Sequence, residues 1–352
     1  MYHRLQFSAC QKVMQGIFKS CSRRTLTLTS THLLQSIRTF CLMILAVIGL
    51  LIVVGCNDTS GTDADSTEPR PLKTVLCTTG MVGDLASAIL GPEVEVNVLM
   101  KAGVDPHLFT PSPRDISLMS QADAIFYNGL HLEAGLSQTL EHMEQNQKQF
   151  VYALATGLTT EDGLIEVAAG QYDPHFWNDL ELWQVAARKF ADSLGERYPD
   201  QAEAYNTRAA QYCDQLQSLL ETSRAQIERI PENRRILISA HDAFEYFGRS
   251  LGLEVAAVQG ISTNAEASVK KVELLVSRVV DNKIPAIFAE SSVSDKSIQA
   301  IIAGCKQRGV DVQLGGTLFS DALGPVGSGA ETFPTMFAAN VKTIVDALNT
   351  TP

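Results

Sequence analysis

The segment Asp200–Ile230, DQAEAYNTRAAQYCDQLQSLLETSRAQIERI, contains neither glycine nor proline and lies between Pro199 and Pro231. Its larger apolar residues recur at spacings near three and four or their sums, which predicts one amphipathic helix. A helix of this length extends roughly 46 Å at about 1.5 Å per residue. Such a rod is long enough to run past one domain and join the next. The segment therefore predicts two bodies connected by one stiff helix.

Short apolar runs alternate with helical stretches on both sides of this helix. Strands are expected at Thr74–Thr78, Val94–Met100, Ala124–Tyr127 and Phe150–Leu154 before it, and at Arg235–Ser239, Glu254–Val258, Ala286–Ala289 and Val310–Leu314 after it. Strands rich in Val, Ile and Leu that alternate with helices predict mostly parallel sheets covered by helices on both faces. We therefore predict an α/β fold of two lobes, with residues 72–199 as the N-terminal lobe, 200–230 as the linking helix and 231–352 as the C-terminal lobe.

The first 55 residues differ from the rest in charge and hydropathy. They hold six Lys and Arg and no Asp or Glu, and the apolar run Phe40–Val54 ends at Gly55 and Cys56. This run is shorter than the roughly 20 residues that span a bilayer, so the pattern predicts a secretory signal. Val53–Cys56 resembles the lipobox of bacterial lipoproteins. We expect residues 1–55 to be a lipoprotein signal peptide with Cys56 lipidated at the cut; an uncleaved signal anchor is the alternative.

Residues 56–71 are polar and poor in large apolar side chains, which predicts a flexible tether between the lipid and the folded body. The chain of 352 residues is 45% apolar and 19% charged, enough to bury a sizeable core. It has 28 Lys and Arg; without the six of the signal, 22 remain against 39 Asp and Glu, a net charge of −17. This balance argues against nucleic acid as a partner, because phosphate binding needs a basic surface, and it favours a cation.

Cysteine usage predicts neither a disulfide framework nor a cysteine-based metal site. Four of the seven cysteines lie in the signal or at its cut, and the folded part keeps Cys77, Cys213 and Cys305, far apart and without a C-x-x-C motif. We expect three buried free thiols, because cysteine is among the most buried residue types, with a single bridge as the alternative.

Three histidines occur in distinctive contexts. His107 and His175 each follow Asp-Pro, and His241 follows the strand expected at Arg235–Ser239. Proline fixes its own φ and restricts the residue before it, so each Asp-Pro-His would hold its imidazole in a defined direction, with the Asp as an orienting partner. Imidazole is the commonest nitrogen ligand of first-row transition metals. The three are far apart in sequence and match no local metal motif, so each histidine taken singly is better explained by packing or a surface position.

The segment Thr78–Glu133 closely resembles the metal-binding lipoproteins of ABC-type zinc and manganese importers, the TroA/ZnuA-like cluster A-I family. Further matches follow in chain order at Asp173–Asn178 (DPHFWN), Ser239–Gly248 (SAHDAFEYFG), Gly260–Ala267 (GISTNAEA), Ile284–Val293 (IPAIFAESSV) and Gly315–Gly324 (GGTLFSDALG). Together they cover nearly the whole chain after the tether, which makes the resemblance specific.

This resemblance implies a metal site in the cleft between the two lobes, with two ligands from each. At the matching positions the ligands are His107 and His175 from the first lobe, and His241 and Asp321 from the second. Taken alone, Asp321 in its Ser-Asp loop would be interpreted as a turn or a helix cap. Glu290, directly after the strand Ala286–Ala289, is a candidate to lie behind the ligands and orient one of them; a plain structural role is the alternative.

The transported ligand implied by the resemblance is one divalent transition metal, Zn²⁺ or Mn²⁺. Manganese-selective members typically place Glu at the third ligand position, where this chain has His241. Many zinc-specific members carry a long loop rich in His and acidic residues, whereas Gly129–Gly170 contains only His131 and His142. Three imidazoles and one carboxylate suit tetrahedral Zn²⁺, and a bidentate Asp321 would serve a metal that takes more oxygen. We favour zinc slightly over manganese.

The resemblance implies a receptor rather than an enzyme. We expect it to lie outside the cytoplasm as a monomer, lipid-anchored to a bacterial membrane in the periplasm or at the cell surface, and to deliver its ion to an ABC permease and its ATPase. Two alternatives stay open. A zinc-dependent hydrolase would need an open coordination position for water and a general base, and Glu290 could be that base although the chain has no H-E-x-x-H motif. An adhesin-like surface lipoprotein is compatible with the anchor.

Overall fold

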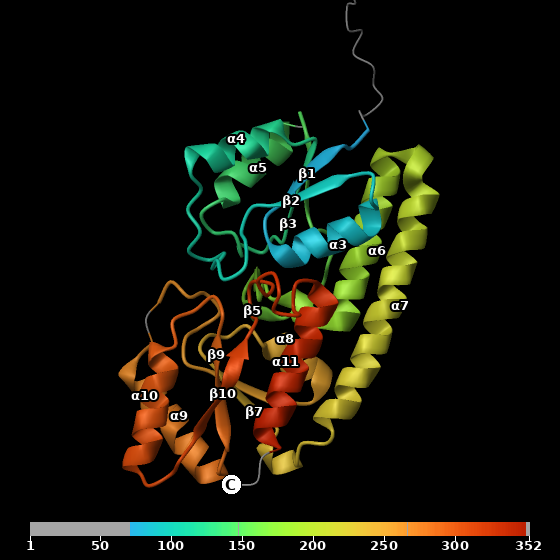
Figure 1. Cartoon of the computed structure of the whole chain (residues 1–352). Coiled ribbons are helices and arrows are strands. Elements are labelled where there is room, and N and C mark those ends of the chain that lie inside the picture. Colours follow the sequence, from blue (N-terminus) through green and yellow to red (C-terminus); the bar gives the residue numbers. More distant parts are fainter. Residues whose placement is uncertain (1–70, 147, 266, 350–352) are drawn as a thin grey trace, which may run out of the picture. The chain divides into compact units, whose positions relative to one another are not determined.

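The computed structural model describes residues 71–349 except 147 and 266, all within the unit Glu68–Pro352 (Figure 1). The predicted signal peptide, the lipidation site Cys56 and all but the last residue of the predicted tether lie outside the described residues. Within the described part of the chain, no helix combines the length and apolar character that crossing a membrane requires.

The first lobe is built on a parallel four-stranded sheet in the order β2-β1-β3-β4. Its strands are β1 (Thr74–Cys77), β2 (Glu95–Val98), β3 (Ala124–Tyr127) and β4 (Phe150–Ala153), and its helices are α3 (Gly80–Leu90), α4 (Pro113–Gln121), α5 (Ser137–Asn146) and α6 (Leu180–Arg197). Thr79 begins α3, and its hydroxyl accepts a hydrogen bond from the backbone N–H of Val82. This capping satisfies one of the free N–H groups at the start of the helix.

Successive residues of these strands face two different cores. Val75 and Cys77 of β1 belong to the main core, whereas Leu76 between them belongs to a smaller one. The smaller core also contains Met119 of α4 and Leu140 of α5. Side chains on a strand point alternately to opposite faces, so the two cores lie on opposite faces of the sheet. Each core also contains helix residues, so helices cover both faces, as the sequence predicts.

A short antiparallel hairpin, which the sequence analysis missed, leads into the second Asp-Pro-His. It consists of β5 (Glu166–Ala168) and β6 (Gln171–Tyr172). Gly170 makes the turn with φ of 70°, a conformation that other residues adopt at a cost. Strands of three and two residues with mixed polarity have too little periodicity to be recognised from sequence. The 3₁₀ helix η1 (Phe176–Asn178) follows directly after His175.

The long linking helix is present as α7 (Ala202–Ile227), preceded by the 3₁₀ helix η2 (Pro199–Gln201). It starts two residues later and ends three residues earlier than the sequence predicts, and it packs against α3 and α6 of the first lobe and against helices of the second (Figure 1). Arg208 donates to the last carbonyls of α3, at Ile89 (2.5 Å) and Leu90 (3.0 Å). A cation is favourable at a helix C-terminus, so this contact fastens the linking helix to the first lobe.

The second lobe contains two parallel strand pairs with helices around them. β7 (Ile236–Ser239) pairs with β8 (Glu254–Ala257), β9 (Ala286–Glu290) pairs with β10 (Gln313–Leu318), and β7 and β9 lie side by side. Its helices are α8 (Glu245–Leu251), α9 (Val269–Asn282), α10 (Lys296–Gln307) and α11 (Phe333–Leu348), with the 3₁₀ helix η3 (Glu232–Arg234) before β7. Arg224 of the linking helix donates to the Ser250 carbonyl near the end of α8 at 2.9 Å. The same kind of contact therefore ties α7 to both lobes.

Each of the eight predicted strands has a counterpart, but the last one is displaced. The prediction was Val310–Leu314, whereas β10 runs from Gln313 to Leu318 with a register shift between Leu314 and Thr317. Glycine weakens the interior of a strand, so Gly315 and Gly316 give no local signal that the strand continues. In the structure Gly315 is needed because a Cβ there would lie 2.7 Å from Cε1 of Phe288, so the strand continues through a close backbone approach.

The three cysteines of the folded part are free and buried, as expected. They are Cys77 in β1, Cys213 in α7 and Cys305 in α10. The fold class also agrees with the prediction: two α/β lobes with mostly parallel sheets, joined by one long helix.

Candidate metal centre

Four side chains that are far apart in the sequence meet in one buried cluster. The ligand atoms of His107, His175, His241 and Asp321 all lie within 4.8 Å of one another. His241 follows β7 and Asp321 follows β10, so both second-lobe residues stand beyond the carboxyl ends of parallel strands. Ligands bind at this edge in open α/β sheets. His107 lies in the loop after β2, and His175 lies between the hairpin and η1.

The distances within the cluster match those around a small metal ion. Nε2 of His107 lies 3.2 Å from Nε2 of His175, Nε2 of His241 lies 3.2 Å from Oδ2 of Asp321, and Nε2 of His175 lies 3.5 Å from Oδ1 of Asp321. Ligands about 2.0–2.1 Å from a tetrahedral zinc ion are separated by about 3.3 Å. Three imidazole nitrogens and one carboxylate are also a donor set that divalent transition metals accept.

Two atoms of the cluster are left without a partner in the described part of the chain. Nε2 of His241 and Oδ1 of Asp321 are buried and make no hydrogen bond there; the 3.2 Å approach of His241 to Oδ2 does not have hydrogen-bond geometry. A buried polar atom without a partner costs about 1–3 kcal/mol, so such atoms call for an explanation. A metal ion at the centre of the cluster would satisfy both, and the residues present therefore fit a metal.

The two Asp-Pro-His segments fold in the same way. Oδ1 of Asp105 accepts from the backbone N–H of His107, and Oδ1 of Asp173 accepts from that of His175, both at 2.9 Å. Asp173 also lies 2.7 Å from Nδ1 of His175, so it orients both backbone and ring. Asp105 bonds only the backbone of its histidine, and its Oδ2 accepts instead from the hydroxyl of Thr263 at 2.6 Å. Of the two aspartates that the sequence suggests as orienting partners, Asp173 therefore contacts the ring of its histidine and Asp105 contacts only the backbone.

Glu290 lies directly behind His241. Its Oε1 accepts from the backbone N–H of His241 at 2.8 Å, and its Oε2 lies 2.5 Å from Nδ1 of the ring. The carboxylate at the end of β9 is buried. By holding Nδ1, it directs Nε2 toward the cluster, which is the arrangement in which histidine binds metals.

The charges of the cluster shift the pKa values of its members in opposite directions. Burial lowers the pKa of His107 to about 4. Burial opposes the charged form of His241 as well, but the carboxylates of Asp321 and Glu290 outweigh it and raise the pKa of His241 well above its ordinary value. Burial would raise the pKa of Asp321, yet His241 and the other imidazoles hold it below its ordinary value. Without a metal, the surroundings therefore favour the neutral form of His107 and the protonated form of His241.

The remaining histidines of the folded part lie elsewhere. His142 is exposed on α5, as expected. His131 is also exposed, with φ of 62°. Phe176 and Trp177 are completely buried and belong to the core.

The short helix after His175 bonds to both ligand segments of the second lobe, a role that the sequence analysis missed. Nε1 of Trp177 donates to the carbonyl of Ser320 at 3.2 Å, next to Asp321. The amide of Asn178 donates to the carbonyl of Ala243 at 2.8 Å, two residues after His241. The only signal in the sequence was that Trp177 and Asn178 lie within three residues of the candidate ligand His175. Periodicity cannot identify their partners, because these lie in the other lobe.

Two α/β lobes on one long helix, with a buried set of metal donors contributed by both, define a metal-binding substrate-binding protein. The family model described as "Zinc-uptake complex component A periplasmic" (ZnuA) matches residues 75–347. The chain belongs to this family. The match covers both lobes and includes all four members of the cluster.

Individual relatives agree with this assignment. The manganese-binding lipoprotein MntA of Bacillus subtilis (strain 168) is 37% identical over 309 residues, which cover 87% of this chain and 98% of MntA. The zinc-binding protein TroA of Treponema pallidum (strain Nichols) is 35% identical over 302 residues, which cover 86% of this chain and 96% of TroA. The solved structure of the periplasmic zinc binding protein TroA from Treponema pallidum matches with a TM-score of 0.75 and covers 80% of this chain and 100% of that one.

Proposed function

We propose that this chain is an extracytoplasmic receptor that binds one divalent transition metal and delivers it to an ABC permease and its ATPase for import. The ligands are His107, His175, His241 and Asp321. The observation that carries the proposal is the buried cluster itself: three imidazoles and one carboxylate at metal-ligand separations, with two buried atoms that make no hydrogen bond in the described part of the chain. Membership of the zinc-uptake family supports the transport role.

Zinc is slightly favoured over manganese as the transported ion. The three short ligand separations, 3.2, 3.2 and 3.5 Å, agree with a tetrahedral ion, and nitrogen-rich sites bind Zn²⁺ more tightly than Mn²⁺. The names of the relatives divide between the two metals, since MntA is a manganese-binding and TroA a zinc-binding protein. Metal analysis of the protein purified from its native envelope tests this preference, and a predominance of manganese would contradict it.

A receptor is favoured over a zinc hydrolase by the position of Glu290. Both of its carboxylate oxygens contact His241, one at the backbone and one at Nδ1, so Glu290 lies behind the ligand and cannot act as a base on a metal-bound water. Four protein ligands also complete a tetrahedral shell, whereas a catalytic zinc keeps one position open for water. Capture of the ion, not hydrolysis, is what this arrangement supports.

The lipid anchor is part of the same proposal. A signal peptide of residues 1–55, lipidation of Cys56 and a tether of residues 56–71 would hold the receptor, as a monomer, close to a membrane permease. Labelled fatty acid should be incorporated into the wild-type protein in its native host and not into Cys56→Ala. Equal labelling of the two proteins would contradict the anchor without affecting the metal site.

The metal site is tested by calorimetry on the double variant His107→Ala/His241→Ala. Loss of one imidazole from each lobe should weaken zinc and manganese binding strongly, because the remaining two ligands cannot complete a coordination shell. The matched control is His142→Ala, which removes an exposed imidazole on α5 and should bind as the wild type does. Wild-type affinity in the double variant would refute the assignment of the ligands.

A further inference from the structure

Asp321 is the only carboxylate among the four candidate ligands, and both of its oxygens face the cluster. Oδ2 lies 3.2 Å from Nε2 of His241, and Oδ1 lies 3.5 Å from Nε2 of His175. Both separations are close to the roughly 3.3 Å between neighbouring ligands of a small metal ion. Each oxygen therefore lies at ligand distance from a different imidazole, and the carboxylate can present both oxygens to one ion.

One oxygen of this carboxylate is held by Ser292, a residue that the sequence analysis did not single out. Ser292 follows β9 and Asp321 follows β10, and these two strands are parallel neighbours. The pairing continues just past β9, where the backbone N–H of Ser291 donates to the carbonyl of Leu318 at 2.9 Å. The two loops therefore begin side by side, and the hydroxyl of Ser292 donates to Oδ2 of Asp321 at 3.3 Å.

A second hydroxyl supports this hydrogen bond. Oγ of Ser292 lies 3.1 Å from Oγ of Ser320, which is completely buried. Burial would raise the pKa of Asp321, but His241 and the other imidazoles hold it below its ordinary value, which favours the ionised carboxylate. An ionised carboxylate only accepts hydrogen bonds, so the single proton of the Ser292 hydroxyl goes to Asp321. Ser320 then donates to Ser292, and two hydroxyls in series hold one carboxylate oxygen.

The other oxygen of Asp321 is left open toward the cluster. Oδ1 is buried and makes no hydrogen bond within the described part of the chain. A carboxylate oxygen has about two lone pairs, so Oδ2 also keeps one for a metal while it accepts from Ser292. The hydrogen bond therefore restricts rotation of the carboxylate without using up either oxygen as a ligand.

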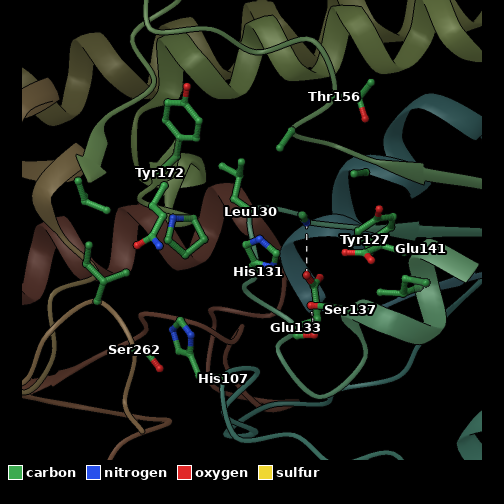
Figure 2. A pocket seen from close by; sticks show the side chains of 18 of the residues that line it. His107, Tyr127, Leu130, His131, Glu133, Ser137, Glu141, Thr156, Tyr172 and Ser262 are labelled. Carbon is green, nitrogen blue, oxygen red and sulfur yellow. Dashed lines mark hydrogen bonds between the residues drawn. The ribbon is translucent and has the colours of Figure 1, made fainter. Parts of the chain in front are cut away.

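The carboxylate is shielded from solvent, so only protein groups orient it. Figure 2 shows His107 in the lining of a cavity of about 660 Å³. Among the described residues, that lining includes neither Asp321 nor Ser292. The side chain of Asp321 is 0% exposed. Because a charged acceptor in a buried site strengthens a hydrogen bond, one hydroxyl matters more here than it would at the surface.

We propose that Ser292 is a positioning residue that keeps both oxygens of Asp321 turned toward the ion, and that it thereby sets how well the site accepts manganese relative to zinc. This inference rests on the proposed function, because it requires a metal at the cluster. Zn²⁺ completes its shell with four donors, for which three imidazoles and either oxygen of Asp321 suffice. Mn²⁺ favours oxygen and a larger number of ligands, so it gains more from the second oxygen.

The proposal is tested by measuring both affinities in Ser292→Ala. Competition with a chelating dye gives the Kd for zinc and for manganese. Manganese binding should weaken by about tenfold, a usual effect of losing a partner behind a ligand, while zinc binding stays within about threefold. Ser292→Thr keeps the hydroxyl, and Ser292 is only partly buried, so this variant should retain the wild-type ratio of the two affinities.

The matched control removes the neighbouring hydroxyl. Oγ of Ser291 is also buried but makes no hydrogen bond within the described part of the chain. Its removal leaves no partner unsatisfied, so Ser291→Ala should bind both metals as the wild type does. Circular dichroism and thermal unfolding establish that each variant is folded.

A spectroscopic measurement separates positioning from a general loosening of the site. Co²⁺ absorbs visible light more strongly in a tetrahedral site than in one with five or six ligands, so its spectrum reports the number of ligands. Bound Co²⁺ should absorb more strongly in Ser292→Ala than in the wild type, because Asp321 then binds through one oxygen. The spectra of Ser292→Thr and Ser291→Ala should match the wild type.

Several outcomes would overturn the role of Ser292. These are unchanged manganese affinity in Ser292→Ala, an equal loss for both metals, an unchanged Co²⁺ spectrum, no recovery in a folded Ser292→Thr, or the same effect in Ser291→Ala. None of them would affect the proposed function, since the wild type would still bind metal. A wild-type protein that binds neither zinc nor manganese would instead overturn the proposed function.

Discussion

Glu290 lies behind His241, outside the cluster of four candidate ligands, and contacts both the backbone and the ring of that histidine. It holds both the backbone and Nδ1 of His241, and through that ring it sets the direction of a ligand atom. Such partners behind a ligand typically contribute about 10–100-fold to metal affinity. The sequence identifies Glu290 only as a candidate, because a glutamate after a strand is also compatible with a plain structural role.

We predict that Glu290→Gln weakens zinc binding by about 10–100-fold, because a neutral amide holds the ring less firmly and makes it a poorer donor. Competition with a chelating dye measures the change. Glu245→Gln, at the first position of α8, is the matched control and should bind like the wild type. Equal affinities of wild type and Glu290→Gln would show that the ring of His241 is held by packing alone.

The opposite pKa shifts within the cluster predict how metal binding depends on pH. The pKa of His241 is raised well above its ordinary value by the carboxylates of Asp321 and Glu290, so we expect the metal to displace a proton from this ring. Affinity should therefore fall as pH is lowered, by about tenfold per pH unit for one released proton. His107, with a pKa lowered to about 4, adds a second proton only near that pH. Calorimetry in buffers of different ionisation enthalpy counts the released protons; a count of zero at neutral pH would contradict the protonation of His241.

At the scale of elements, the linking helix is joined to the first lobe by a buried polar chain. Nε1 of Trp183 on α6 donates to the hydroxyl of Tyr212 on α7 at 3.4 Å, and that hydroxyl donates to Oδ2 of Asp84 on α3 at 3.1 Å. Burial raises the pKa of Asp84 to about 6, against hydrogen bonds from the Phe333 backbone and Tyr212 that favour the ionised form. Asp84 belongs to α3, Tyr212 to α7 and Phe333 to the start of α11. Asp84 therefore connects a helix of the first lobe with the linking helix and with a helix of the second lobe.

We predict that Tyr212→Phe lowers the free energy of unfolding by about 1–3 kcal/mol, because Asp84 then loses a donor while it stays largely buried. Urea denaturation measures the loss. Tyr205→Phe, two turns earlier on α7, is the matched control, since the described residues give its hydroxyl no hydrogen bond and its loss should cost less than about 0.5 kcal/mol. Similar losses in both variants would mean that the Asp84 contact does not contribute.

At the scale of the whole molecule, the four candidate ligands come from both lobes. Two candidate ligands come from segments before α7 and two from segments after it, so a bound ion would add a connection that the long helix does not provide. The contacts of Trp177 and Asn178 with the carbonyls of Ser320 and Ala243 lie beside this connection. We therefore expect metal binding to stabilise the folded protein.

We predict that metal removal lowers the thermal stability of the whole protein. A ligand that binds only the folded state adds about 2.7 kcal/mol when its free concentration is 100 times the Kd. The midpoint of thermal unfolding should therefore fall by several degrees in excess chelator and recover when zinc is added back. His142→Ala should respond in the same way, and His107→Ala/His241→Ala should not respond. A chelator-independent midpoint in the wild type would contradict the coupling.

Several elements could be predicted from local pattern alone. The helix Ala202–Ile227 and the strands β1 to β4 and β7 to β9 follow from periodicity and composition, because the spacing of apolar residues is set within one element. The hairpin β5–β6 and the true extent of β10 could not be predicted in this way. The strands of the hairpin are too short to show a periodicity, and the continuation of β10 depends on the close approach of Phe288 to Gly315.

The α/β class, the linking helix and the net negative charge follow from the sequence alone, and its resemblance to a known family indicates three histidines and an aspartate as candidate ligands. Their spacing in the sequence could not predict that these residues lie close together, because His107 and Asp321 are far apart in the chain and belong to no common motif. Only the tertiary structure brought them within 4.8 Å, placed Glu290 behind His241 and left the His107 ring without a carboxylate partner beside a cavity. The physical reason is that periodicity describes one element, whereas a site at the ends of strands depends on strand order and on how the two lobes pack.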